Sequence, residues 1–149
     1  MRTLRYEDVR EGDELPELVV ELTPTLIVST AIASRDYQDV HHDRDLAKQK
    51  GSKDIFMNIL TTTGYVGRFV TDWAGPEALL RNVSIRLGAP NYPYDTMTVT
   101  GEVTKAEQGD DEGLVTVNVK GSNTLGDHVI ATVDLVLPLG DRWPAGKHT

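Results

Sequence analysis

The chain has 149 residues, a hydrophobic fraction of 39% and a formal net charge of -8 at pH 7. This length suits one domain with its own core, and the negative charge argues against duplex nucleic acid or an anionic membrane surface as a partner, because either would repel the chain. With no cysteine, the chain has no disulfides, no thiolate nucleophile and no cysteine-based zinc site, so catalysis must use oxygen or imidazole groups.

The first half of the chain predicts one strand and two short helices. Leu18–Leu22 is an apolar run typical of a strand, and Thr23 followed by proline is typical of a helix start. We expect the first helix to carry Leu26–Ala33. Asp43 is expected to cap a second, brief helix over Arg44–Lys50, which leaves the residues between the two helices as a loop.

The second half predicts one long helix and a run of strands. Apolar residues recur at spacings of three and four from Asn58 to Trp73, which is typical of a helix with one buried face, and Asn58 is a suitable N-cap. Four strands are expected after it: Leu80–Leu87, Thr96–Lys105, Leu114–Lys120 and Val129–Leu137. The element order favours an α+β fold, with an antiparallel sheet wrapped around the central helix in a domain of residues 1–139 and a flexible tail at 140–149.

The sequence lacks several well-known functional motifs. It contains no dinucleotide-binding or phosphate-binding glycine loop, no H-E-x-x-H zinc motif and no G-x-S-x-G nucleophile motif, so no cofactor is predicted. The first residues are charged, and no segment approaches the roughly 18 apolar residues of a membrane span, so we expect a cytoplasmic protein.

A dense group of ionisable residues lies between the first two predicted helices. Three carboxylates and two imidazoles fall within Asp36–Asp43, which is compatible with an acid–base pair, a divalent metal site or a solvated capping loop. His41 and His42 would point to opposite sides of an extended segment, so no metal site is predicted. Capping explains Asp43 but gives no reason for Asp36 and His41 to occur together.

The order Asp36-x-x-x-x-His41-x-Asp43 resembles the signature of MaoC-like (R)-specific enoyl-CoA hydratases, usually written D-x-N-P-x-H-x-D. Three stretches are similar, more narrowly, to the small catalytic subunit of actinobacterial heteromeric steroid side-chain enoyl-CoA hydratases: Arg35–Asp45, Gly51–Phe56 and Asn123–His128. The resemblance covers nearly the whole chain and implies a hotdog fold. In two places the chain departs from the family: Gln38-Asp39 replaces the usual Asn-Pro, and Met57-Asn58 replaces the usual His-Gly.

The resemblance implies hydration of a 2-enoyl-CoA to a 3-hydroxyacyl-CoA, with a steroid (cholesterol-type) side chain as the acyl group. Asp36 and His41 would be the catalytic pair that deprotonates water, and backbone amides at Asn58 and Ile59 would bind the thioester oxygen. The implied partners are an acyl-CoA substrate and a second hotdog chain, in a dimer or in a heterotetramer with a larger MaoC-like subunit. Two alternatives stay open: a hotdog acyl-CoA thioesterase, or a non-catalytic subunit that stabilises a partner.

Overall fold

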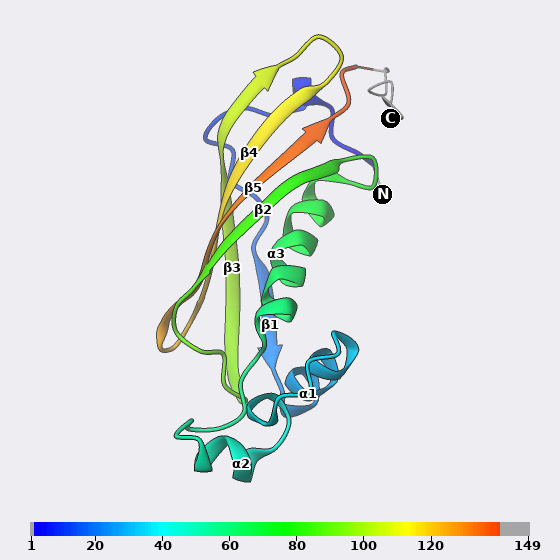
Figure 1. Ribbon diagram of the computed structural model, residues 1–149. Helices are drawn as coiled ribbons and strands as arrows, with labels where there is room; N and C mark the ends of the chain where they lie inside the picture. Colours follow the sequence, from blue (N-terminus) through cyan, green and yellow to red (C-terminus); the bar gives the residue numbers. More distant parts are fainter. Residues whose placement is uncertain (1, 141–149) are drawn as a thin grey trace.

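The computed structural model describes residues 2–140, and its main feature is a five-stranded antiparallel sheet with the order β1-β3-β4-β5-β2 (Figure 1). The strands are β1 (Leu18–Leu22), β2 (Leu79–Leu87), β3 (Asp95–Gln108), β4 (Gly113–Asn123) and β5 (Gly126–Leu137). All four strand pairs are antiparallel. The sheet curves along one side of the long helix α3 (Ile59–Ala74), which confirms the predicted α+β hotdog architecture.

The shorter helices lie together near the N-terminal end of α3 (Figure 1). They are α1 (Pro24–Ala33), α2 (Arg44–Gln49) and the 3₁₀ turn η2 (Asp39–His41). The other 3₁₀ turn, η1 (Tyr6–Asp8), lies at the opposite end of the sheet, where the N–H of Tyr6 donates to the carbonyl of Pro138. The caps predicted for α1, α2 and α3 are all present, with side chains of Thr23, Asp43 and Asn58 accepting from first-turn backbone N–H groups. Within residues 2–140, no helix combines the length and the hydropathy needed to cross a membrane.

The segment between α1 and α2 differs from the extended loop that the sequence predicts. The N–H of His41 donates to the carbonyl of Gln38, and the N–H of His42 donates to the carbonyl of Asp39, so the chain forms the 3₁₀ turn η2. The two histidines still diverge, because His41 is buried whereas His42 is exposed. The tail predicted for residues 140–149 lies outside the described residues, except for Gly140.

The helix α3 packs closely against the middle of the sheet. Its buried side chains include Val66, Phe69 and Val70, and these face a sheet interior made mostly of valine. Gly101 of β3 lies under Phe69, where an added Cβ would be only 2.7 Å from the Cε1 atom of the ring. The glycine therefore allows the helix to lie close to the sheet, and this packing fixes the position of α3.

The two glycines of α3, Gly64 and Gly67, have different surroundings. A Cβ at Gly67 would lie 3.8 Å from the Cδ1 atom of Leu80, which is ordinary contact with β2. A Cβ at Gly64 would have no atom within 4 Å, so the packing against the sheet does not explain this residue. Gly64 instead borders open space.

Candidate active site

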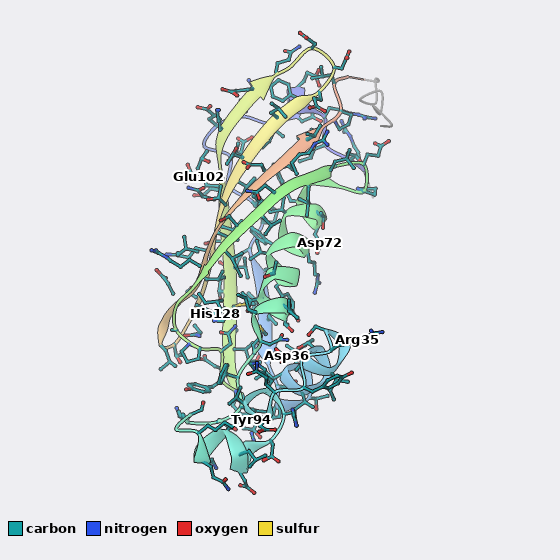
Figure 2. The ribbon with its side chains drawn as sticks, viewed as in Figure 1. Arg35, Asp36, Asp72, Tyr94, Glu102 and His128 are labelled. Carbon is teal, nitrogen blue, oxygen red and sulfur yellow. The ribbon has the colours of Figure 1, made fainter. Side chains whose placement is uncertain are left out.

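Asp36 is placed by the way α1 ends. The N–H of Asp36 donates to the carbonyl of Ala31 at 2.9 Å, and the N–H of Arg35 donates to the carbonyl of Ile32 at 3.0 Å, a pair of bonds typical of a Schellman C-cap. Arg35 has a φ of 57°, a left-handed conformation that usually belongs to glycine. The helix end therefore turns the chain sharply and directs Asp36 toward the N-terminal end of α3 (Figure 2).

His41 faces Asp36 from the end of η2. Its side chain is almost buried, and its Nδ1 atom lies 2.7 Å from the carbonyl oxygen of Phe56. Because a carbonyl can only accept, Nδ1 carries the hydrogen, and this leaves Nε2 directed at Asp36. The distance from Nε2 to Oδ2 of Asp36 is 3.4 Å. The edge of the Phe56 ring packs against the imidazole with ring centroids 4.9 Å apart, which holds the ring plane.

The turn that carries His41 is anchored by Asp39. Lys50 Nζ donates to Oδ2 of Asp39 at 2.9 Å, and this hydrogen bond together with the charge of Lys50 holds the pKa of Asp39 below its ordinary value. The backbone carbonyl of Asp39 also accepts from the N–H of Asp43 at 2.8 Å. These contacts tie η2 to α2, so the loop is restrained although it lacks the proline that is usual in the family.

The pair Asp36–His41 presents two acceptors to the same small space. When His41 is neutral, its Nε2 lone pair and the carboxylate of Asp36 both need a hydrogen, and neither supplies one to the other. One water molecule can donate to both and is then activated at its oxygen. This arrangement is suited to general base catalysis with water as the nucleophile.

Asn58 caps the start of α3 and connects the helix to the Asp36–His41 pair. The Oδ1 atom of Asn58 accepts from the N–H of Thr61 at 3.0 Å, and its Nδ2 atom donates to Oδ2 of Asp36 at 3.1 Å and to Oγ of Ser34 at 2.9 Å. The side chain is only 1% exposed. The sequence predicts the capping role of this residue, but the contact with Asp36 depends on the fold and has no local signal.

The oxyanion prediction concerns the backbone at the start of α3. The first N–H groups of any helix have no partner within the helix, and the helix dipole adds positive potential there. Among residues 2–140, none accepts a hydrogen bond from the N–H of Ile59 or Leu60. Ile59 is 50% exposed, so this end of the helix is open on the outside. The amide role of Asn58 and Ile59 therefore stays a prediction.

His128 of β5 supports the first turn of α3 from the sheet side (Figure 2). Its Nδ1 atom donates to the carbonyl of Ala89 at 2.7 Å, so its Nε2 atom accepts from the hydroxyl of Thr62 at 2.8 Å. Burial lowers the pKa of His128, although the bond to Ala89 acts in the opposite direction. In the sequence, His128 ends the stretch Asn123–His128 that resembles the steroid hydratase subunits, and no local pattern predicts a role for it.

We expect the buried His128 to make the stability pH dependent. Its pKa is lower in the folded chain than in the unfolded chain, so the unfolded chain binds more protons below about pH 6.5, and stability is lost as the pH falls. Urea unfolding of wild type and His128→Gln between about pH 7.5 and pH 5 measures this. The variant is expected to lose part of the slope, whereas the exposed His42→Gln should keep it; equal slopes for all three proteins would contradict the assignment.

The curved sheet, the long central helix and the Asp36–His41 pair together define a hotdog-fold protein with a candidate acid–base site. The model of the MaoC like domain family matches residues 10–124, which is most of the chain. The chain therefore belongs to the MaoC-like family.

Three relatives illustrate the similarity. The chain is 62% identical, over 124 residues, to the 3-oxo-4,17-pregnadiene-20-carboxyl-CoA hydratase beta subunit of Mycobacterium tuberculosis, covering 83% of this chain and 93% of the relative. A chain in the crystal structure of the ChsH1-ChsH2 complex from Mycobacterium tuberculosis is 60% identical, with a TM-score of 0.82 over 86% of this chain and 98% of that chain. R-hydratase PhaJ1 from Pseudomonas aeruginosa is 18% identical with a TM-score of 0.79, over 93% of this chain and 88% of that chain, and supports the fold alone.

These findings confirm the predicted MaoC-like family, the hotdog fold and the hydratase class of enzyme.

Proposed function

We propose that this chain is the catalytic subunit of a heteromeric hydratase that converts a 2-enoyl-CoA to a 3-hydroxyacyl-CoA, with a steroid side chain as the acyl group. The observation that carries the proposal is the Asp36–His41 pair, whose two acceptor atoms lie 3.4 Å apart beside the N-terminal end of α3. The steroid is proposed because the relative with 62% identity is named for a pregnadiene carboxyl-CoA substrate.

In the proposed reaction, water donates its hydrogens to Oδ2 of Asp36 and Nε2 of His41. One O–H bond breaks as the water oxygen bonds to the β-carbon, and the electrons of the double bond move toward the thioester oxygen. The backbone amides at Asn58 and Ile59 stabilise the negative charge on that oxygen, and the proton taken by the catalytic pair is then returned to the α-carbon. Such an amide donor contributes about 10²–10³-fold to a rate.

A groove between α1 and α3 offers a place for the acyl group. It has a volume of about 420 Å³, within the range of small-molecule pockets. Ser34, which is hydrogen bonded to Asn58, lies on its wall, so the groove adjoins the catalytic pair. The lining residues are Thr30, Ala33, Ser34, Leu60, Thr61, Gly64, Tyr65 and Arg68. The open space beside Gly64 is part of this groove.

Filling the groove at Gly64 is expected to select against bulky acyl groups. Gly64→Leu should lower kcat/KM for a steroid side-chain enoyl-CoA by about tenfold or more, because overpacking a binding surface costs roughly 1–3 kcal/mol, and it should leave crotonyl-CoA hydration unchanged. Gly67→Ala, which lies outside the groove on the same helix, is the control and should leave both substrates unaffected. An unchanged kcat/KM for the steroid substrate in Gly64→Leu would place the acyl group elsewhere.

The edge strand β2 is the proposed contact with the partner subunit. Within residues 2–140 it pairs only with β5, and it carries the exposed apolar side chains of Leu79, Leu80 and Leu87. An uncovered edge with apolar side chains favours pairing with a second sheet. The similar chain in the ChsH1-ChsH2 complex supports a different hotdog chain, a larger MaoC-like subunit, as that partner.

The function is tested by following the loss of enoyl absorbance with this chain alone and with a purified larger MaoC-like subunit. A steroid side-chain enoyl-CoA and crotonyl-CoA serve as substrates. We expect turnover of the steroid substrate in the mixture and little with either chain alone. Activity of this chain alone on crotonyl-CoA would instead make it a general short-chain hydratase.

A further inference from the structure

We propose that the side chain of Asn58 positions the catalytic carboxylate of Asp36, an inference that rests on the proposed function. The family usually has glycine in this place, which has no side chain to contact Asp36. In this chain the Nδ2 atom of Asn58 lies 3.1 Å from Oδ2 of Asp36, the same oxygen that faces His41. The amide therefore touches the oxygen that would accept from the nucleophilic water.

The orientation of the Asn58 amide follows from its neighbours. The N–H of Thr61 can only donate, so the atom 3.0 Å from it must be the amide oxygen. The two hydrogens on Nδ2 then point at Ser34 and Asp36. Ser34 can accept because its own hydroxyl donates to the carbonyl of Thr30 at 2.7 Å. Every hydrogen in this set has a partner, so the reverse orientation of the amide would break three contacts.

Asp36 is thereby held through both carboxylate oxygens. Its Oδ1 atom accepts from the N–H of Gln38 at 3.3 Å, while Oδ2 accepts from Asn58. A carboxylate attached to a short side chain otherwise turns readily about its last bond. The two donors restrict that rotation and leave Oδ2 facing His41. A misplacement of a reacting group by about 1 Å can cost a rate factor near 10², so this restraint has a measurable kinetic consequence.

If Asn58 only capped α3, its loss would change stability and not catalysis. Two substitutions distinguish this role from the positioning of Asp36. Asn58→Ser keeps a good N-cap for α3 but removes the donor to Asp36. Asn58→Asp keeps the cap and the shape, and replaces the donor by a second carboxylate against Asp36. Thr23→Ala is the control for loss of helix capping alone. It removes the cap of α1, where the Thr23 hydroxyl accepts from the N–H of Leu26 and does not contact Asp36 or His41.

We expect Asn58→Ser to lower kcat about 10–100-fold with KM and melting temperature nearly unchanged. Asn58→Asp should lower kcat at least as much, and its acidic pH limb should move to higher pH because two adjacent carboxylates favour a shared proton. Thr23→Ala should lower the melting temperature by a few degrees with kcat unchanged. Wild-type kcat and pH profile in both Asn58 variants would overturn the proposal.

A second measurement does not depend on turnover. The carbon-13 NMR signal of the Asp36 carboxylate, recorded at one fixed pH, should change its chemical shift in Asn58→Ser relative to wild type, because the variant loses the Nδ2 donor to Oδ2. An unchanged signal would show that Asn58 does not hold Asp36. If the wild-type chain has no hydratase activity but the signal still moves in the variant, the proposed function fails while the contact between Asn58 and Asp36 stands.

Discussion

Replacing Asp36 by Asn is expected to lower kcat for hydration by about 10²–10⁴-fold, with His41→Gln causing a loss of similar size. The amide cannot take a proton from water, and its NH₂ group would meet the Nδ2 donor of Asn58, so both the chemistry and the positioning are lost. Because the two residues act on one water, the double variant should be little slower than either single variant. Steady-state kinetics of the assembled complex measure this.

Two exposed neighbours are matched controls for these substitutions. Asp45→Asn and His42→Gln remove the same charge and the same ring from side chains that are open to solvent, and both should retain wild-type kcat. Circular dichroism should show that all four single variants are folded. If Asp36→Asn and His41→Gln kept the wild-type rate in the complex, the chain would be a non-catalytic subunit and the partner would carry the chemistry.

The largest expected loss of stability comes from Phe69→Ala. Truncating a buried phenylalanine typically costs about 3–5 kcal/mol, and Phe69 lies almost fully buried between α3 and the sheet. Because α3 carries Asn58 and the first-turn amides, loss of this contact should also lower activity before the chain unfolds. Urea unfolding gives the free-energy change, and kcat of the folded variant gives the functional effect.

The contact with Gly101 makes this prediction specific. Gly101→Ala places a Cβ 2.7 Å from the Phe69 ring and should cost about 1–3 kcal/mol by overpacking. In a Phe69→Leu background the same glycine substitution should cost less, because the ring is gone and the two changes are coupled. If the changes in the free energy of unfolding for Gly101→Ala and Phe69→Leu were additive, the Phe69 ring would not be what requires glycine at position 101.

The elements that the sequence predicts correctly have strong local signals. Thr23 with Pro24, Asp43 and Asn58 each cap the helix expected after them, and the spacing of apolar residues identifies α3. The strands also occur in the expected order, although β3, β4 and β5 extend further than predicted because sheet pairing continues through polar residues near the two hairpins that join them. Local chemistry is enough here because caps and periodicity depend on residues only a few positions apart.

The parts that could not be predicted depend on contacts between distant residues. Asn58 meets Asp36 and Ser34 across more than twenty positions, and His128 meets Thr62 across sixty-six. Nothing near these residues signals such bonds, since each side chain has a sufficient local interpretation as a cap or a strand residue. The same reason applies to Gly101 of β3, whose role depends on Phe69 of α3, a residue far from it in the sequence.

The loop before α2 shows how a departure from the family pattern can be compensated. The sequence suggests a looser loop, because Gln38-Asp39 lacks the proline that would fix a backbone angle. The structure instead places Asp39 in a 3₁₀ turn and in an ion pair with Lys50 of the helix end that follows. The spacing of Asp36 and His41 is retained, and their side chains meet.

Product analysis by mass spectrometry shows directly whether the chain adds water to a 2-enoyl-CoA through Asp36. The assembled complex is incubated with a steroid side-chain 2-enoyl-CoA, and the products of wild type and Asp36→Asn are compared. We expect an acyl-CoA heavier than the substrate by one water in the wild type, and very little of it in the variant. Release of free coenzyme A would instead identify a thioesterase, and water addition at the wild-type rate in Asp36→Asn would contradict the assigned site.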